Sequence, residues 1–242
     1  MGAYGWGMRI LMLATFAACA TSQPLPPAAS STPPPVAAAK PERFDEKIRQ
    51  DFFDGIRGDA AALDRAQKLC EDTLANHPDE PEALVWHGAA ITARSQQAFA
   101  RGDRDKGMEL YAKGIGEMDR AVALAPTSVA VRIPRGAVYL AMAHFVPQPE
   151  QTKLVQEGVS DYEATLVVQQ AYFAKLTLHS REQLLYGLTD GYAMLGNTDK
   201  ARATYERMRH DAAGSALLTR AAERAAGHEV AGNTPCEQCH AR

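Results

Sequence analysis

The sequence lacks a dense cluster of lysine and arginine and lacks the usual signatures of catalysis. Its 26 Lys and Arg residues oppose 29 Asp and Glu residues, for a formal net charge of −3. We therefore expect no nucleic-acid partner, because phosphate binding needs a concentrated basic surface. The chain has no P-loop, dinucleotide fingerprint, nucleophile elbow or zincin motif. We expect a protein that is not an enzyme.

The sequence is also poor in valine, isoleucine and threonine outside short stretches, whereas alanine dominates. This balance favours helix over strand, since β-branched side chains lose rotamer freedom in helices and alanine loses none. The hydrophobic and charged fractions, 46% and 23%, are those of an ordinary globular domain. The sequence therefore predicts an all-α fold, with one large or two small helical domains.

The N-terminal apolar segment is too short to cross a membrane. It runs from Ile10 to Phe16 after a single Arg9, and Ala17 and Ala18 then lead into Cys19. A membrane-spanning helix needs about 20 apolar residues. The segment resembles the signal and lipobox of bacterial lipoproteins, although Phe16 stands where leucine is usual. The resemblance implies a signal peptide over residues 1–18 and lipidation of Cys19; the alternative is an ordinary cleaved signal peptide with Cys19 incidental.

Proline dominates the stretch that follows. Residues 20–41 contain seven prolines among Ala, Ser and Thr, and such a composition favours an extended spacer without a core. We expect residues 19–41 to tether a domain to the membrane. Ala20 replaces the aspartate that retains some lipoproteins at the inner membrane, so the lipoprotein resemblance implies an outer-membrane location facing the periplasm.

The region 42–227 reads as successive helices separated by proline and glycine. Breaks are expected at His77-Pro78, Gly102-Asp103, Pro126 and Pro147–Pro149. One long helix is expected to continue from Val155 to Phe173. Ser180, with Gln183 three residues later, fits a capping box at the next helix start. Cys70 and His87 fall on the packed faces of their helices and are expected in the core.

One stretch of this region carries a repeat signature, formed by Leu185, Leu188, Tyr192, Gly196, Ala201 and Tyr205. The spacing resembles a tetratricopeptide repeat (TPR), with Thr189 where a small glycine is usual. Gly88 and Gly136 begin looser units whose spacing exceeds the roughly 34-residue TPR period. The resemblance implies an α-α superhelix of about four helix pairs, some with lengthened helices. Such repeats usually bind a peptide or partner helix on their concave face.

The tail, residues 228–242, contains the one motif with chemistry, Cys236-Glu237-Gln238-Cys239-His240. In an exported chain this CxxCH resembles the attachment site of c-type haem. The resemblance implies thioether bonds from Cys236 and Cys239, with His240 as an axial ligand of the iron. His228 is a candidate second ligand, and Met208 or His210 are alternatives if the tail folds back. A five-coordinate iron also stays open.

Three other interpretations of the same motif stay open. Cys236 and Cys239 form a local disulfide readily in an oxidising compartment. With His240 and His228 they supply four ligands for a metal ion. A thioredoxin-like redox pair is the third, although its βαβ context is absent.

These observations predict a membrane-anchored periplasmic scaffold that binds another envelope protein through TPR-like repeats. The first alternative is a tethered TPR-cytochrome that acts in electron transfer. The second is a solute-binding accessory of a transporter, since the long helices are similar to those of lipoproteins associated with tripartite transporters. A deep, closed, apolar cavity would favour the solute-binding alternative.

Overall fold

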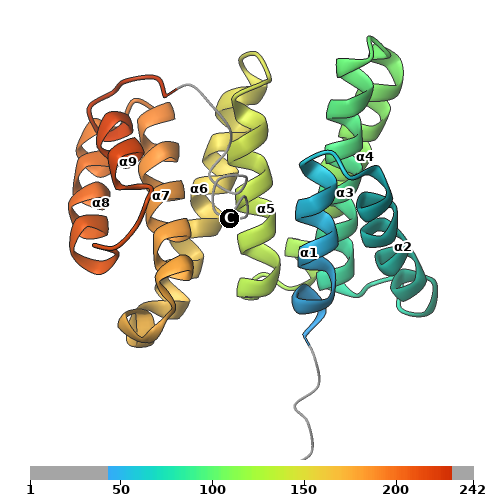
Figure 1. Ribbon diagram of the computed structural model, residues 1–242, viewed down its shortest axis with the longest axis horizontal. Coiled ribbons are helices and arrows are strands. Elements are labelled where there is room, and N and C mark those ends of the chain that lie inside the picture. The colour runs from blue at the N-terminus through green and yellow to red at the C-terminus, as the bar shows by residue number, and fades with distance from the viewer. Residues whose placement is uncertain (1–42, 231–242) are drawn as a thin grey trace, which may run out of the picture. The chain divides into compact units, whose positions relative to one another are not determined.

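The computed structural model describes residues 43–230, which belong to a compact unit that begins at Pro41. Within this range the chain forms nine α-helices, one short 3-10 helix and no strand (Figure 1). The all-α prediction is confirmed. The elements are α1 (Phe44–Ile56), α2 (Ala60–Asn76), α3 (Pro81–Ala100), α4 (Arg104–Leu124), α5 (Val129–Ala143), α6 (Glu150–Gln169), η1 (Gln170–Lys175), α7 (Leu178–Met194), α8 (Thr198–Asp211) and α9 (Leu218–Ala225).

Consecutive helices pack as antiparallel pairs, α1 with α2, α3 with α4, α5 with α6 and α7 with α8 (Figure 1). The odd-numbered helices α1, α3, α5, α7 and α9 also contact one another in succession and form one layer. The expected α-α superhelix of four helix pairs is therefore confirmed, with α9 added at the end. The helices of the α3–α4 pair are also lengthened, as expected, to 20 and 21 residues.

Three of the four pairs share the same turn between their helices. A glycine with positive φ, at Gly58, Gly102 and Gly196, is followed by an aspartate or asparagine. The side chains of Asp59, Asp103 and Asn197 each accept a hydrogen bond from the backbone N–H three residues later. Glycine adopts the left-handed conformation without a steric penalty, and the capping side chain satisfies a free N–H of the next helix. This local signal ends one helix and starts its partner.

Two of the expected helix limits are wrong. Helix α6 ends at Gln169, and Phe173 lies in the 3-10 helix η1, so the long helix does not continue to Phe173. The N-cap of α7 is Thr177, whose Oγ1 accepts from the Ser180 N–H at 3.1 Å. Thr177 has the extended backbone that an N-cap requires, whereas Ser180 already lies in the first turn. The residue spacing fits a helix that continues to Phe173 and a cap at Ser180, but the local backbone conformation sets the two observed boundaries.

The stretch whose spacing resembles a TPR, Leu185 to Tyr205, forms the helix pair α7 and α8. Leu185, Leu188 and Ala201 are buried between α7 and α8. Thr189 is buried as well, and its Oγ1 donates to the Leu185 carbonyl oxygen at 2.8 Å. Because the hydroxyl is satisfied inside its own helix, threonine is tolerated where the repeat usually has glycine.

Cys70 and His87 lie in the core, as expected. The Cys70 thiol is fully buried, and burial raises its pKa well above the ordinary value. A thiol in such an environment is packed and unreactive. The imidazole of His87 is buried between α3 and α4, where its Nδ1 lies 2.7 Å from Glu117 Oε2.

None of the helices within residues 43–230 combines the length and the apolar character needed to span a membrane.

Candidate binding groove

The layer of odd-numbered helices lines a groove of about 1240 Å³ that is partly open to solvent. Its apolar surface comes mainly from α1, α3 and α5, with further contributions from Tyr162, Tyr172, Leu176 and Tyr186. Representative apolar and aromatic lining residues are Phe52, Phe53, Trp86, Ile133, Val138, Met142 and Tyr186. The concave face that the repeat resemblance implied is thus present as a continuous, mainly apolar surface.

An aromatic cluster forms the end of the groove between α1 and α3. Phe52 packs edge-on against Phe53 at 5.4 Å and against Trp86 at 5.1 Å between ring centroids. The indole N–H of Trp86 is buried and has no acceptor in the part of the chain that the structure describes. A buried donor without a partner costs free energy, and because protein atoms cover this N–H it is not exposed to a bound molecule.

Helix α5 crosses the middle of the groove and contains a proline in its interior. Pro134 has no N–H, so the carbonyl of Ala130, one turn earlier, lacks its helical donor. Both residues line the groove.

A charged network forms the other end of the groove, where α5, α7 and α9 meet. His144 Nε2 lies 3.3 Å from Asp190 Oδ2, and Arg224 Nε donates to Asp190 Oδ1 at 2.5 Å. Burial alone would raise the pKa of Asp190, but His144 and Arg224 outweigh burial and hold it below its usual value. Asp190 therefore stays a carboxylate that fixes both neighbouring side chains.

The same network contacts the last described residues of the chain. Arg224 Nη1 donates to the His228 carbonyl oxygen at 3.0 Å and lies 3.4 Å from Glu229 Oε1. Val230 then lines the groove. The chain beyond α9 thus reaches the groove at its charged end.

The residues proposed from sequence divide into two groups. Cys19, Cys236, Cys239 and His240 lie outside the described residues, so lipid and haem attachment stay predictions. His228 is described: its imidazole is exposed and its Nδ1 lies 2.6 Å from Glu223 Oε2.

Of the other two proposed axial ligands, one is excluded. Met208, on α8, is completely buried in the hydrophobic core, so its sulfur is not accessible to a haem on the tail. His210 is exposed on α8, where it pairs with Asp211, and does not line the groove. Among residues 43–230, no group of three or more His, Cys, Asp or Glu side chains is arranged to hold a metal ion.

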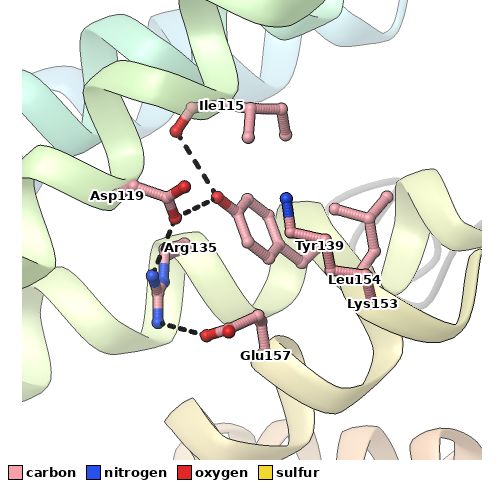
Figure 2. Close-up of a pocket in the computed structure, with 7 residues that line it drawn as sticks. All are labelled: Ile115, Asp119, Arg135, Tyr139, Lys153, Leu154 and Glu157. Carbon is pink, nitrogen blue, oxygen red and sulfur yellow. Dashed lines mark hydrogen bonds and ion pairs between the residues drawn. The ribbon is translucent and has the colours of Figure 1, made fainter. Parts of the chain in front are cut away.

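A second, smaller pocket of about 200 Å³ lies between α4, α5 and α6 (Figure 2). Arg135 pairs there with Asp119 at 2.9 Å and with Glu157 at 3.5 Å, and Tyr139 donates to Asp119 at 2.6 Å. The pocket is smaller than ordinary ligand sites of about 300–1,000 Å³. Because these polar groups bond to one another, we assign the cluster to stability.

Sequence reasoning did not find the network of His144, Asp190 and Arg224. The partners are 46 and 34 residues apart, so no local spacing could reveal them. The only sequence signal was a histidine directly after an apolar helix. No protein-family model, curated protein or solved structure matches the chain.

Proposed function

We propose that this protein is a TPR-like scaffold, anchored by lipid to the outer membrane and facing the periplasm, whose groove holds an amphipathic helix of another envelope protein. The observation that carries the proposal is the open apolar groove of about 1240 Å³. It is larger than typical small-molecule sites of about 300–1,000 Å³ and is not closed. These two properties favour a protein segment over a transported solute.

The lining of the groove favours a helix over an extended peptide. An extended segment brings unpaired backbone N–H and C=O groups, and each costs free energy when an apolar wall covers it. A helix satisfies its own backbone and presents only side chains.

Replacing Ile133 by aspartate tests the groove, because a carboxylate on the apolar floor of α5 would be buried against the partner's apolar face. We expect a loss of about 2 kcal/mol of binding free energy, a typical value for an interface hot spot, which corresponds to roughly 30-fold weaker binding. Affinity capture from detergent-solubilised envelopes, quantified by mass spectrometry, should show one protein enriched by the wild type and depleted with the Ile133→Asp variant.

Val167→Asp is the matched control. Val167 is an apolar residue on α6 that is 73% exposed and does not line the groove. The Val167→Asp variant should enrich the same protein as the wild type. Equal enrichment by all three proteins would contradict a groove-mediated interaction, and so would the absence of any enriched protein.

A tethered cytochrome is the second candidate function, favoured by the position of Val230 in the groove lining. Cys236 follows Val230 by six residues in the sequence. A haem held there would supply one-electron chemistry, passing an electron between a reduced donor protein and an oxidised acceptor protein.

Covalent haem is tested by expressing the full chain with the c-type maturation machinery and recording its visible spectrum after denaturation and reduction. We expect haem bands that persist in the denatured wild-type chain. They should disappear when Cys236 and Cys239 are both replaced by alanine, because no thioether then forms. A colourless wild-type protein would remove this candidate and leave the disulfide and metal interpretations of the motif.

A further inference from the structure

The two ends of the groove differ in the charge of the side chains that line them. Charged side chains of both signs line the aromatic end in equal number, and they are Arg43, Asp45, Glu46 and Arg49. The buried Asp45 pairs there with both arginines. At the other end, two arginines, Arg220 and Arg224, line the groove with one carboxylate, Asp190. Among the described residues that line the groove, the excess of positive charge therefore lies at the end formed by α7 and α9.

The two arginines of this end differ in their surroundings. Arg224 is buried, and its Nε donates to the carboxylate of Asp190 at 2.5 Å. Arg220 lies one turn earlier on α9 and is half-buried in the groove wall, where its Nε lies 3.4 Å from the Tyr186 hydroxyl. Because arginine stays protonated in proteins, Arg220 presents a positive charge at the groove surface.

The start of α7 adds polar side chains to the same end of the groove. The polar lining residues at the N-cap and in the first two turns of α7 are Thr177, His179, Ser180 and Gln183. Hydroxyl, amide and imidazole groups can all donate hydrogen bonds to a carboxylate. Two glutamates pair with this wall from outside the lining, Glu182 at 3.5 Å from His179 and Glu229 at 3.4 Å from Arg224. The lining itself keeps two arginines against one carboxylate.

We infer that the helix held in the groove carries acidic side chains at one end, and that this end lies against Arg220 and the first turns of α7. The inference rests on the proposed function, because it describes the partner helix of that proposal. The partner's carboxylates accept hydrogen bonds from Arg220, a strong pairing because both groups are charged. Apolar side chains of the same helix cover α5 and the aromatic cluster, where the lining charges cancel.

The width of the helix layer sets the length of such a partner helix. From α1 to α7 the layer has three steps between contacting helices, and packed helices lie about 8–10 Å apart, so the span is roughly 24–30 Å. At a rise of about 1.5 Å per residue, this span corresponds to about 16–20 residues of helix. A fatty acid has the same carboxylate chemistry, but the groove of about 1240 Å³ exceeds typical small-molecule sites of about 300–1,000 Å³. The size of the groove therefore favours a helix.

The test uses the full chain, expressed without export so that no detergent is needed, and a pair of synthetic peptides of about 18 residues. Both peptides form the same leucine-rich amphipathic helix with an amidated C-terminus, and one has glutamates in its last turn where the other has lysines. Fluorescence anisotropy of the labelled peptides measures binding. We expect the wild type to bind the glutamate peptide about tenfold more tightly than the lysine peptide. The Arg220→Glu variant should prefer the lysine peptide.

The matched control is Arg202→Glu, which changes the net charge of the chain by the same amount. Arg202 is exposed on α8 and does not line the groove, so this variant should bind both peptides as the wild type does. Arg220→Lys keeps the positive charge and should keep the preference for the glutamate peptide. Circular dichroism verifies that each variant is folded.

The possible failures are distinguishable. A wild type that binds both peptides equally, with Ile133→Asp weakening both, overturns the acidic end and leaves the helix-binding groove intact. A preference for the glutamate peptide that persists in the Arg220→Glu variant refutes the assignment of Arg220. If the wild type binds neither peptide, the helix is not the occupant and both proposals fail. Binding of palmitate in that case would assign the same end of the groove to a lipid carboxylate.

Discussion

Replacing Asp161 by alanine is expected to lower the free energy of unfolding by about 3–5 kcal/mol, the usual loss when one partner of a buried ion pair is removed. Asp161 on α6 is completely buried. It accepts hydrogen bonds from Arg132 at 2.6 Å and from Arg135 at 2.7 and 2.8 Å. The substitution would remove the one fully buried carboxylate that Arg135 contacts and leave it only the half-exposed Asp119 and Glu157. Urea titration followed by circular dichroism measures the loss.

Arg135 explains why the effect should be large. Burial alone would lower the pKa of Arg135, but its hydrogen bond and charge interaction with Asp161, with a further contribution from Asp119, together outweigh burial and raise the pKa. Arginine is effectively always protonated in proteins, so the guanidinium stays charged when Asp161 is removed. Glu157→Ala is the matched control, because Glu157 contacts the same arginine at 3.5 Å and its side chain is about half exposed. It should change stability by no more than about 1 kcal/mol, as exposed ion pairs do. Equal losses for Asp161 and Glu157 would contradict the dominant role of the buried pair.

Replacing Gly114 by alanine is expected to destabilise the protein by about 1–3 kcal/mol or more, because α3 and α4 cross in contact there. A Cβ on Gly114 would lie 2.3 Å from Thr92 Oγ1 and 2.7 Å from the Gly88 carbonyl oxygen. The Gly88 carbonyl is backbone of the partner helix and has no rotamer by which to move away. The two helices would have to separate, and α3 carries Trp86 of the aromatic cluster. Thermal and urea unfolding measure the loss.

Replacing Gly116, in the same helix, by alanine is expected to have the opposite effect on the stability of the protein. A Cβ on Gly116 meets no atom within 4 Å, and the residue is exposed. Alanine is preferred over glycine in a helix interior by roughly 0.5–1 kcal/mol, so this substitution should stabilise the protein. If both substitutions shifted the free energy of unfolding in the same direction, helix propensity, and not the close contact between α3 and α4, would control the effect of the Gly114 substitution.

The helices and their pairing could be predicted because the signals are local. Gly102-Asp103 and Gly196-Asn197 end one helix with a left-handed glycine and cap the next with a side chain three residues from the N–H it binds. Pro126 and Pro147 are also local signals, because proline lacks a backbone N–H and disfavours the helical conformation of the residue before it. A local signal also misleads locally, since Thr177 caps α7 where Ser180 had the expected spacing.

The candidate binding groove required information that local spacing does not contain. His144, Asp190 and Arg224 come from three helices and meet only because α5, α7 and α9 pack in one layer. The same holds for Asp161 with Arg135, and for the aromatic contact of Phe52 with Trp86. Sequence alone therefore predicted the helical elements and their order, since turns and caps act within a few residues. The groove and its charged end depend on packing between distant residues, which only the tertiary structure brings together.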